Sequence, residues 1–393
     1  MKILWVKSDF LHPTISGGQI RTLELLKRLH RRHEIHYVAL DLDNQPGGVE
    51  RSSEYCTKAY PVPHYAPLHT RPRFWLQVAG SMFSDLPLAV SRYRSQGMQR
   101  HVAELTRRER FDAVVCDFLF PAPNISDLSS VVLFQHNVEA QIWKRRLEHA
   151  SNAPVRMYLR SQYEKMRRYE AHVCRAVKRV IAVSEPDAAS MRSGYRAARV
   201  DAVPTGVDVE YFTPPRDVKR AGNLVFVGAM DWAPNVDGIH WFVEEVFPRI
   251  HLRRSDCTLT IAGRRPDAAI RKLAAKYPGI HVTGTVEDVR PFLWEAAVSI
   301  VPLRIGGGTR LKIFEAMAAQ VPVVSTTIGA EGLEVRHGET IRIADSPEDF
   351  AEHCLELLSD SAAARCLSEA ARKLVSACYS WEVASREFER LLL

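Results

Sequence analysis

Short apolar runs alternate with loops and amphipathic stretches from the first residues, and this pattern predicts parallel α/β units. A buried-type strand is expected at 3–7, a loop at 8–18 and a helix at about 19–32, with Leu23, Leu26 and Leu29 on one helix face. Strand, helix and strand in this order form the βαβ unit of a parallel sheet. Further strands are predicted at 34–40, 113–116, 131–134 and 180–183, whereas 42–72, rich in Pro, Gly, Ser and His, is expected to be a long surface excursion.

A second series of alternating elements begins after a turn at 204–208, which predicts a domain boundary. Its strands are expected at 224–228, 259–262, 281–284, 299–302 and 321–325, and its helices at 235–253, 266–276, 288–297 and 309–319. The tail from 347 to 393 is predicted to be helical with a break near 379–381. We therefore expect an α/β protein with two Rossmann-like domains facing each other across a cleft, at 1–203 and 204–378. The helix at 379–393 is expected to cross back to the first domain.

Composition excludes several classes of protein. The chain has 393 residues, of which 46% are apolar and 25% charged, as in ordinary globular proteins and unlike disordered or collagen-like ones. No apolar run approaches the length of about 20 residues that spans a bilayer, and the first one stops at Val6, too short for a signal peptide. The seven cysteines form no CxxC pair, which argues against a zinc site or a disulfide framework and favours the cytoplasm.

Charge is distributed unevenly along the chain. Residues 1–200 contain 31 Lys and Arg against 19 Asp and Glu, and the stretch 141–179 alone contains eleven basic residues against three glutamates. A basic surface suits nucleic acid, anionic lipid or a phosphorylated substrate, and a solvated helix face is the alternative. Because no RNA- or DNA-binding motif accompanies this stretch, nucleic acid is not expected as a partner.

The strongest local signal is a glycine loop between a buried strand and a helix. Gly306, Gly307 and Gly308 follow the strand, and the helix is expected to start at about Thr309. Glycines allow a ligand to approach the backbone, and a helix N-terminus attracts anions. Lys312 and Glu315, at i and i+3, share one helix face and could bind the phosphate and the ribose hydroxyls of a nucleotide. A plain loop followed by an i,i+3 ion pair is the alternative.

Other polar residues lie beyond the carboxyl ends of predicted strands, where open α/β sheets bind ligands. Gly17 and Gly18, with Arg21 one turn later, follow the first strand and would face the other glycine loop across the cleft. A simple tight turn would explain the same glycines. Candidates of the same kind are His136, Glu139, Asp231 and Asn235, for which a buried structural histidine and helix caps are the alternatives.

Residues 306–318 followed by 320–326 resemble the donor-binding signature of the retaining family 4 glycosyltransferases. The similarity covers nearly the whole chain, is strong over 222–345 and diffuse over 42–130, and is closest to bacterial exopolysaccharide-biosynthesis enzymes with a GGGTRLK loop. The resemblance implies a GT-B fold, a nucleotide-diphosphate sugar as donor, retention at the anomeric carbon, and no metal or other cofactor.

Not all of the family's residues are present. Glu315 matches the glutamate that binds the ribose, but the family's other glutamate falls on Gly307. The family's phosphate-binding Arg and Lys fall on Ala229 and Asn235. We expect Arg310 and Lys312 to supply the missing cations, because a pyrophosphate still needs positive charge.

The resemblance therefore implies a hexosyltransferase that moves a sugar to an acceptor hydroxyl, with Arg310, Lys312 and the Gly17-Gly18 amides stabilising the departing diphosphate. His136 would orient the donor sugar or the acceptor. The expected acceptor is a glycan or lipid-linked intermediate of cell-surface glycan assembly, with peripheral contact at the inner face of an anionic membrane through the basic N-terminal domain. The alternatives are a sugar-nucleotide epimerase or hydrolase on the same fold, and a non-catalytic nucleotide-sugar binder.

Overall fold

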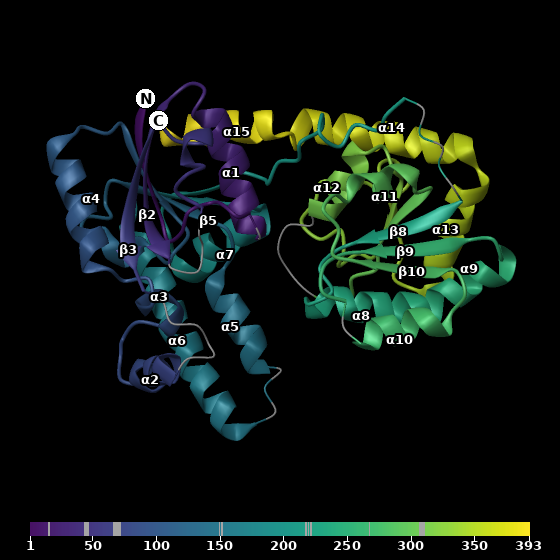
Figure 1. Cartoon of the computed structure of the whole chain (residues 1–393), viewed down its shortest axis with the longest axis horizontal. Coiled ribbons are helices and arrows are strands. Elements are labelled where there is room, and N and C mark those ends of the chain that lie inside the picture. The colour runs from purple at the N-terminus through teal and green to yellow at the C-terminus, as the bar shows by residue number, and fades with distance from the viewer. Residues whose placement is uncertain are drawn as a thin grey trace. The chain divides into compact units, whose positions relative to one another are not determined.

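The computed structural model describes the whole chain except residues 15, 43–46, 66–71, 149, 151, 217, 219, 221, 267 and 306–310, and the side chains of 72–74, 268 and 269. The chain folds into two compact units (Figure 1). Unit 1 comprises Met1–Thr205 together with Ala384–Leu393, and unit 2 comprises Gly206–Val383. Each unit is built on its own parallel sheet.

Unit 1 contains a seven-stranded parallel sheet in the order β3-β2-β1-β4-β5-β6-β7. Its strands are β1 (Lys2–Lys7), β2 (Glu34–Leu42), β3 (Lys58–His64), β4 (Ala113–Asp117), β5 (Val131–Gln135), β6 (Arg179–Ala182) and β7 (Val200–Ala202). Its helices are α1 (Gly17–Leu29), α2 (Pro72–Ser81), α3 (Leu88–Ser91), α4 (Gln96–Arg108), α5 (Glu139–Glu148), α6 (Ala153–Ala176), α7 (Glu185–Tyr195) and α15 (Trp381–Leu392), with short 3-10 turns at Ser52–Glu54 and Ala122–Asn124.

Both faces of this sheet are covered, as its continuous apolar strands require. Leu4 and Val6 of β1 belong to the core under the helices α3 to α7. Trp5, between them in the sequence, points to the other face and packs against Phe388 of α15, with ring centroids 5.6 Å apart. Glu389 of the same helix forms an ion pair with Arg32. The end of the chain is therefore part of the core of unit 1.

Unit 2 contains a six-stranded parallel sheet in the order β10-β9-β8-β11-β12-β13. Its strands are β8 (Asn223–Val227), β9 (Thr258–Ala262), β10 (Ile280–Gly284), β11 (Val298–Val301), β12 (Val323–Ser325) and β13 (Arg342–Ile343). Its helices are α8 (Ala233–Trp241), which continues through a π-helical turn (Phe242–Val246) into α9 (Phe247–Arg253), α10 (Ala268–Lys276), α11 (Arg290–Glu295), α12 (Leu311–Ala318), α13 (Pro347–Ser359) and α14 (Ser361–Cys378). One apolar core lies under α8, α9, α10 and α13, and another under α11, α12 and α14.

The α/β class and the two Rossmann-like sheets are confirmed, and most predicted strands lie within two residues of the observed ones. One expectation was wrong: residues 42–72 are not only a surface excursion, because β3 forms the edge of the sheet within them. Pro61 and Pro63 had suggested a loop in this segment. An edge strand tolerates prolines because the backbone on its outer side forms no hydrogen bonds with a neighbouring strand. The helical tail also breaks at Asp360, which caps α14. Among the described residues, every helix is too short or too polar to cross a bilayer.

Candidate active site

Each sheet has a switch point, where the strand order reverses and ligands of open α/β sheets bind. In unit 1 it lies between β1 and β4, and in unit 2 between β8 and β11. The sequence candidates that the structure describes follow these strands or their neighbours, or lie on the helices beside them.

The switch point of unit 1 is built around a buried carboxylate, Asp117 at the end of β4. Its side chain has no exposed surface, and four side chains surround it. One oxygen lies 3.1 Å from Lys7 Nζ and 2.8 Å from His136 Nε2, and the other accepts hydrogen bonds from Trp5 Nε1 (2.9 Å) and Thr22 Oγ1 (2.7 Å). Burial alone would raise the pKa of Asp117, but Lys7 and His136 hold it well below its usual range. Asp117 is therefore a fixed negative charge.

His136, directly after β5, is held at both ring nitrogens. Nε2 faces the Asp117 carboxylate and so carries the proton, which leaves Nδ1 to accept from Arg21 Nη1 at 2.9 Å. Burial lowers the pKa of His136 to about 3, against the opposing effect of Asp117. The imidazole is therefore neutral, and in this geometry it links Asp117 to Arg21.

Arg21 places a buried positive charge beside the start of α1. Its Nη1 donates to His136 and its Nε donates to Thr205 Oγ1 at 2.6 Å. Burial lowers the pKa of Arg21 to about 10, so the guanidinium remains charged at neutral pH. Lys7 and Asp117 form a buried ion pair, and Asp9 interacts electrostatically with both, so cations and carboxylates are mixed beside this helix N-terminus.

Gly17 and Gly18 form the first turn of α1, whose N-cap is Ser16 in a capping box with Gln19. Only Gly18 is closely packed: a Cβ atom there would lie 2.8 Å from the Phe118 ring. That ring stacks on His136 at 3.9 Å, and Phe118 itself has a left-handed backbone with φ of 71°. A Cβ atom at Gly17 would meet nothing within 4 Å. Gly18 thus serves packing, whereas Gly17 borders open space.

Glu139 begins α5 but does not cap it. The amides of Glu139 and Ala140 donate instead to the carboxylate of Glu170, which also accepts from Gln135 Nε2 and Tyr195 Oη. Burial, followed by the nearby charge of Glu170, raises the pKa of Glu139 to about 7. Glu170 is therefore the residue that fixes α5 beside β5.

The switch point of unit 2 contains a cation held over the end of β8. Lys312 Nζ donates to Asn235 Oδ1 at 2.8 Å and lies 4.1 Å from the centre of the Phe226 ring. Asn235, buried on the first turn of α8, donates in turn to Ala229 O at 2.8 Å. A Cβ atom at Gly228 would lie 2.7 Å from Lys312 Nζ, so only glycine leaves room for the ammonium. The structure thus joins two sequence candidates that are 77 residues apart.

Glu315 lies one turn further along α12 and is half-buried. Burial raises its pKa to about 7, and the charge of Lys312 opposes this shift. A carboxyl group with this pKa exists in both protonation states near neutral pH.

The remaining candidates of unit 2 fall into two groups. Asp231 forms ion pairs with Arg264 and Arg265. The N-cap of α8 is Trp232, so neither Asp231 nor Asn235 caps this helix. Gly306, Gly307, Gly308, Thr309 and Arg310 lie outside the described residues.

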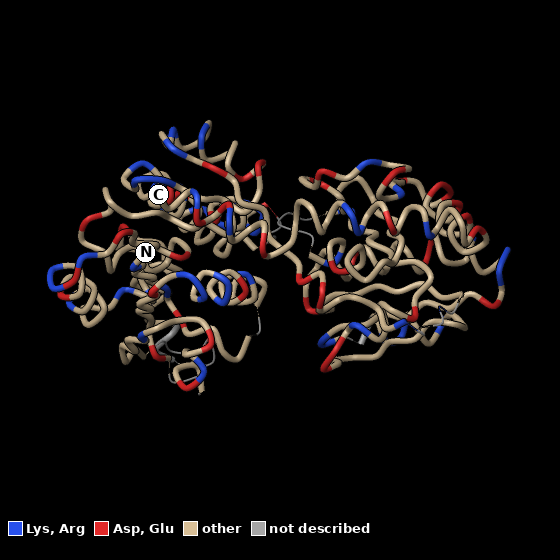
Figure 2. Tube along the Cα trace, turned by 90° about the horizontal axis from the view of Figure 1, so that it is seen from above, with Lys and Arg blue, Asp and Glu red and all other residues tan. Residues whose placement is uncertain are grey.

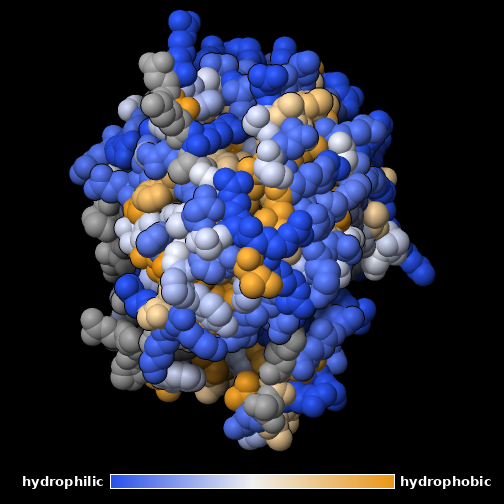
Figure 3. Space-filling view, turned by 90° about the vertical axis from the view of Figure 1, so that its right-hand side faces the viewer, coloured by the Kyte–Doolittle hydropathy of each residue, from blue (hydrophilic) through white to orange (hydrophobic). Residues whose placement is uncertain are grey.

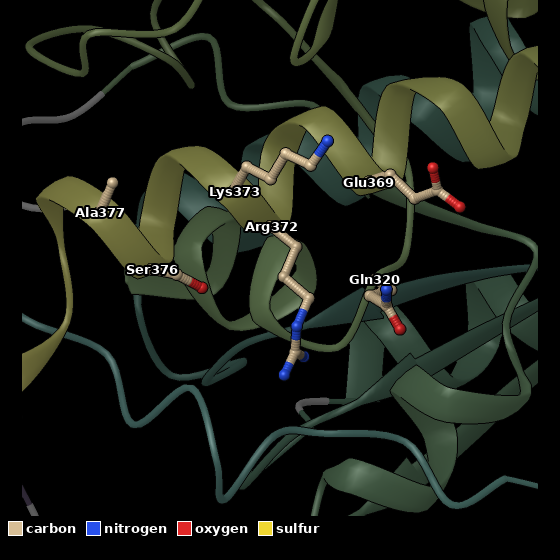
Figure 4. Close-up of a pocket in the computed structure, with 6 residues that line it drawn as sticks. All are labelled: Gln320, Glu369, Arg372, Lys373, Ser376 and Ala377. Carbon is tan, nitrogen blue, oxygen red and sulfur yellow. The ribbon is translucent and has the colours of Figure 1, made fainter.

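A pocket of about 620 Å³ on unit 2 lies away from these residues (Figure 4). Its lining is Gln320, Glu369, Arg372, Lys373, Ser376 and Ala377. Gln320 follows the C-terminal end of α12, whereas Lys312 is at its start. Arg372 donates to Ala318 O and to Thr213 Oγ1, and so holds α14 against the rest of the unit. This pocket does not belong to the candidate site.

Sequence reasoning missed the residues at the centre of the unit 1 site, Lys7 and Asp117. A signal was available in the sequence, since each is a charged residue that directly follows an apolar run and ends its strand. The sequence contains no comparable signal for Thr22 and Thr205, because their role depends on contacts between distant segments.

Two family models match the chain. The model described as Glycosyltransferase Family 4 matches residues 15–211, and the model described as Glycosyl transferases group 1 matches residues 221–360. Sucrose-phosphate synthase from Thermosynechococcus elongatus has a similar structure, with a TM-score of 0.70 at 17% identity over 99% of this chain and 98% of that one. HepE of Anabaena in complex with UDP and glucose gives a TM-score of 0.68 at 11% identity over 100% and 99%. The expected GT-B fold is thereby confirmed.

Two relatives are similar in sequence. An uncharacterized 44.6 kDa protein in the cps region of Klebsiella pneumoniae is 24% identical over 370 residues, which are 90% of each chain. A GDP-mannose-dependent monoacylated alpha-(1-6)-phosphatidylinositol monomannoside mannosyltransferase from Corynebacterium glutamicum is 26% identical over 209 residues, 48% of this chain and 55% of that protein. The match of the family model over half of the chain is decisive, and the protein is a glycosyltransferase of family 4.

Proposed function

We propose that this glycosyltransferase moves a hexose from a nucleotide-diphosphate sugar to an acceptor hydroxyl with retention at the anomeric carbon and without a metal ion. The observation that carries the proposal is the Lys312 ammonium, held at the switch point of unit 2 by Asn235 and the Phe226 ring. A cation in this position suits a diphosphate at the carboxyl end of β8. HepE, which has a similar fold and forms a complex with UDP and glucose, supports a donor of this kind.

The leaving group explains how these residues would act. As the bond to the sugar breaks, negative charge develops on the diphosphate, and preorganised cations lower the barrier by stabilising it. Lys312 would do this in unit 2, and Arg310 is proposed for the same role from the sequence. The backbone at Gly17 and the Arg21 guanidinium would do so at the start of α1.

His136 would act through its neighbours in this scheme. Both of its ring nitrogens already have partners, Asp117 and Arg21, so direct contact with a sugar hydroxyl requires the bond to Arg21 to break. We therefore propose His136 as a positioning residue that holds the Arg21 guanidinium. Glu315 would accept the ribose hydroxyls in its carboxylate form.

The proposed acceptor is a glycan or lipid-linked intermediate of cell-surface glycan assembly, reached from the cytoplasmic side by peripheral contact with the membrane. Two relatives support this, because one is named for the cps region and the other for a mannosylated phosphatidylinositol.

The test begins with a thermal-shift panel of UDP-, GDP- and dTDP-sugars, because a ligand at 100 times its Kd adds about 2.7 kcal/mol of stability. The stabilising donor is then incubated with candidate acceptors, and the anomeric configuration of the product is read by NMR. Inversion would overturn the retaining mechanism. Release of free nucleotide and sugar in the absence of any acceptor would favour the hydrolase alternative.

A further inference from the structure

A column of aromatic rings leads away from the buried His136 in unit 1. The Phe118 ring stacks on His136 at 3.9 Å, and Phe120 stacks on Phe118 with ring centroids 5.8 Å apart. Tyr93, which follows α3, contacts Phe120 at 5.8 Å. We call Phe118, Phe120 and Tyr93 the aromatic column. Because His136 is 2% exposed and the three rings are half-buried, the column runs from the site of unit 1 toward the surface.

The backbone at both ends of the aromatic column is held by hydrogen bonds. Phe118 has a left-handed conformation with φ of 71°, which is unfavourable for a bulky side chain, and its amide donates to Phe134 O at 2.8 Å. At the other end, the buried Asn124 donates to Tyr93 O and accepts from the Ser95 amide, both at 2.8 Å. Unfavourable backbone conformations that the surrounding structure maintains are concentrated at functional sites, so Phe118 is an indication of one.

Asp9, in the loop after β1, is a carboxylate that a ligand can reach. Gln19 Nε2 donates to its Oδ2 at 3.0 Å, and Ser8 Oγ donates to its Oδ1 at 3.4 Å. A carboxylate oxygen can accept two hydrogen bonds, so each of these oxygens can accept another. Asp9 is half-buried, whereas Asp117 has no exposed surface. Of these two carboxylates, Asp9 is therefore the one that can contact a ligand.

Asp9 lies near both ends of the aromatic column. Burial, followed by the charge of Asp9, raises the pKa of Tyr93. Burial also raises the pKa of Asp9, and the Lys7 ammonium, which lies 4.5 Å from the centre of the Phe118 ring, opposes this shift. Because the interaction between charged groups weakens with distance, both effects place the Asp9 carboxylate close to the column.

We propose that Asp9 and the aromatic column form a subsite for a pyranose ring of the acceptor. The C–H groups on one face of a pyranose are apolar and pack on Phe120 and Tyr93, while its hydroxyl groups donate to the Asp9 carboxylate. The column begins at His136, which binds Arg21, so the subsite adjoins a residue proposed for the diphosphate. The inference rests on the proposed function, and it narrows the acceptor to one that presents a sugar unit.

The charges around the subsite favour a neutral ligand. The cations Lys7 and Arg21 lie beside the carboxylates of Asp9 and Asp117, and Lys and Arg are interspersed with Asp and Glu along the trace of unit 1 (Figure 2). The part of unit 2 seen in Figure 3 is mainly hydrophilic, with small separate apolar groups. A few polar groups beside aromatic side chains are typical of sites that bind small molecules. A pyranose, with an apolar face and hydroxyl edges, fits this combination better than a phosphate or an alkyl chain.

The test is saturation-transfer NMR of the full chain with the methyl pyranosides of glucose, galactose, mannose and N-acetylglucosamine, each with and without UDP or GDP. At least one pyranoside should receive saturation, most strongly at the C–H protons of one ring face. Asp9→Asn should weaken its binding at least about tenfold, because a charge-assisted hydrogen bond is lost. Phe120→Leu keeps an apolar side chain but removes the flat ring, and it should weaken binding by about threefold or more.

The controls lie at the other end of the same strand. Phe111 and Asp112 directly precede β4, whereas Phe118 and Phe120 follow it, and Phe111 is half-buried like Phe120. Phe111→Leu and Asp112→Asn therefore make the same chemical changes away from the subsite, and both should bind the pyranoside like the wild type. Urea unfolding of each variant distinguishes lost binding from lost folding.

Three results would overturn the inference. Absence of saturation transfer to all four pyranosides would exclude a pyranose subsite, and wild-type affinity in both Asp9→Asn and Phe120→Leu would place it elsewhere. If Phe120→Leu instead removes saturation from the base protons of UDP or GDP, the aromatic column binds the nucleotide. Donor binding is measured separately by thermal shift: a protein that binds a pyranoside through Asp9 but no nucleotide sugar would refute the proposed function and leave the subsite standing.

Discussion

Replacing Gly18 by alanine should destabilise unit 1, whereas the same change at Gly17 should not. The added Cβ of Gly18→Ala would lie 2.8 and 2.9 Å from two carbons of the Phe118 ring. The ring cannot easily retreat, because it stacks on His136 and faces the Lys7 ammonium at 4.5 Å. Overpacking of this kind costs about 1–3 kcal/mol.

The matched variant separates packing from function. Gly17→Ala adds its methyl group to open space, and its free energy of unfolding should change by no more than about 0.5 kcal/mol. If the diphosphate lies against the first turn of α1, as proposed, the same methyl group should weaken donor binding. Gly17→Ala is thus expected to lower donor affinity at nearly unchanged stability.

Urea unfolding followed by a signal from unit 1 measures the first effect, and calorimetric titration with the donor measures the second. A loss of about 1 kcal/mol corresponds to about 2–4 °C in Tm for a domain of 150–250 residues. Equal stability of the Gly18→Ala variant and the wild type would show that Phe118 has room to move, and the packing argument would fail. Unchanged donor affinity in Gly17→Ala would remove the first turn of α1 from the donor site.

Three further predictions concern charge. Lys312→Met should lower kcat/KM at least about tenfold, because a charge-assisted hydrogen bond contributes about 1.5–3 kcal/mol; full activity would mean that the phosphate charge is bound elsewhere. Asp117→Asn should lower the free energy of unfolding by about 3–5 kcal/mol, since it removes the carboxylate that pairs with the buried Lys7 ammonium, and a change below about 1 kcal/mol in urea unfolding would contradict this. Glu315 should favour ribonucleotide over dideoxynucleotide increasingly as the pH rises through about 7, where its carboxylate forms, and Glu315→Ala should remove this dependence. The raised pKa also means that the contribution of Glu315 to stability is complete below pH 4.5 and is lost as the pH rises through about 7.

Local pattern was sufficient for most of the fold. A buried parallel strand needs a continuous apolar run, and the helix after it needs an amphipathic one, so β1 and α1 are evident from neighbouring residues alone. The same reasoning located the loops at the carboxyl ends of the strands, and with them Gly17, His136 and Lys312. It failed at β3, because Pro61 and Pro63 are typical of a loop. Only the position of β3 at the edge of the sheet explains why a strand contains them.

The partners of the site residues depend on the tertiary structure. Asp117 lies 110 residues from Lys7 in the sequence, and Lys312 lies 77 from Asn235, yet each pair is in direct contact. Such contacts arise only when the sheet brings the carboxyl ends of distant strands together. They determine that His136 is neutral and bound at both nitrogens, which no motif could indicate.

The sequence by itself therefore determined most of the strands and helices, the two-unit α/β architecture and the loops on which the chemistry lies, because these follow from periodicity over a few residues. It did not indicate the edge strands β3, β7 and β13. The tertiary structure decided which charges are buried, which are paired and which apolar side chains remain outside. Burial depends on what covers a residue, and Asp117 is enclosed by Trp5, Lys7, Thr22 and His136, which come from other parts of the chain.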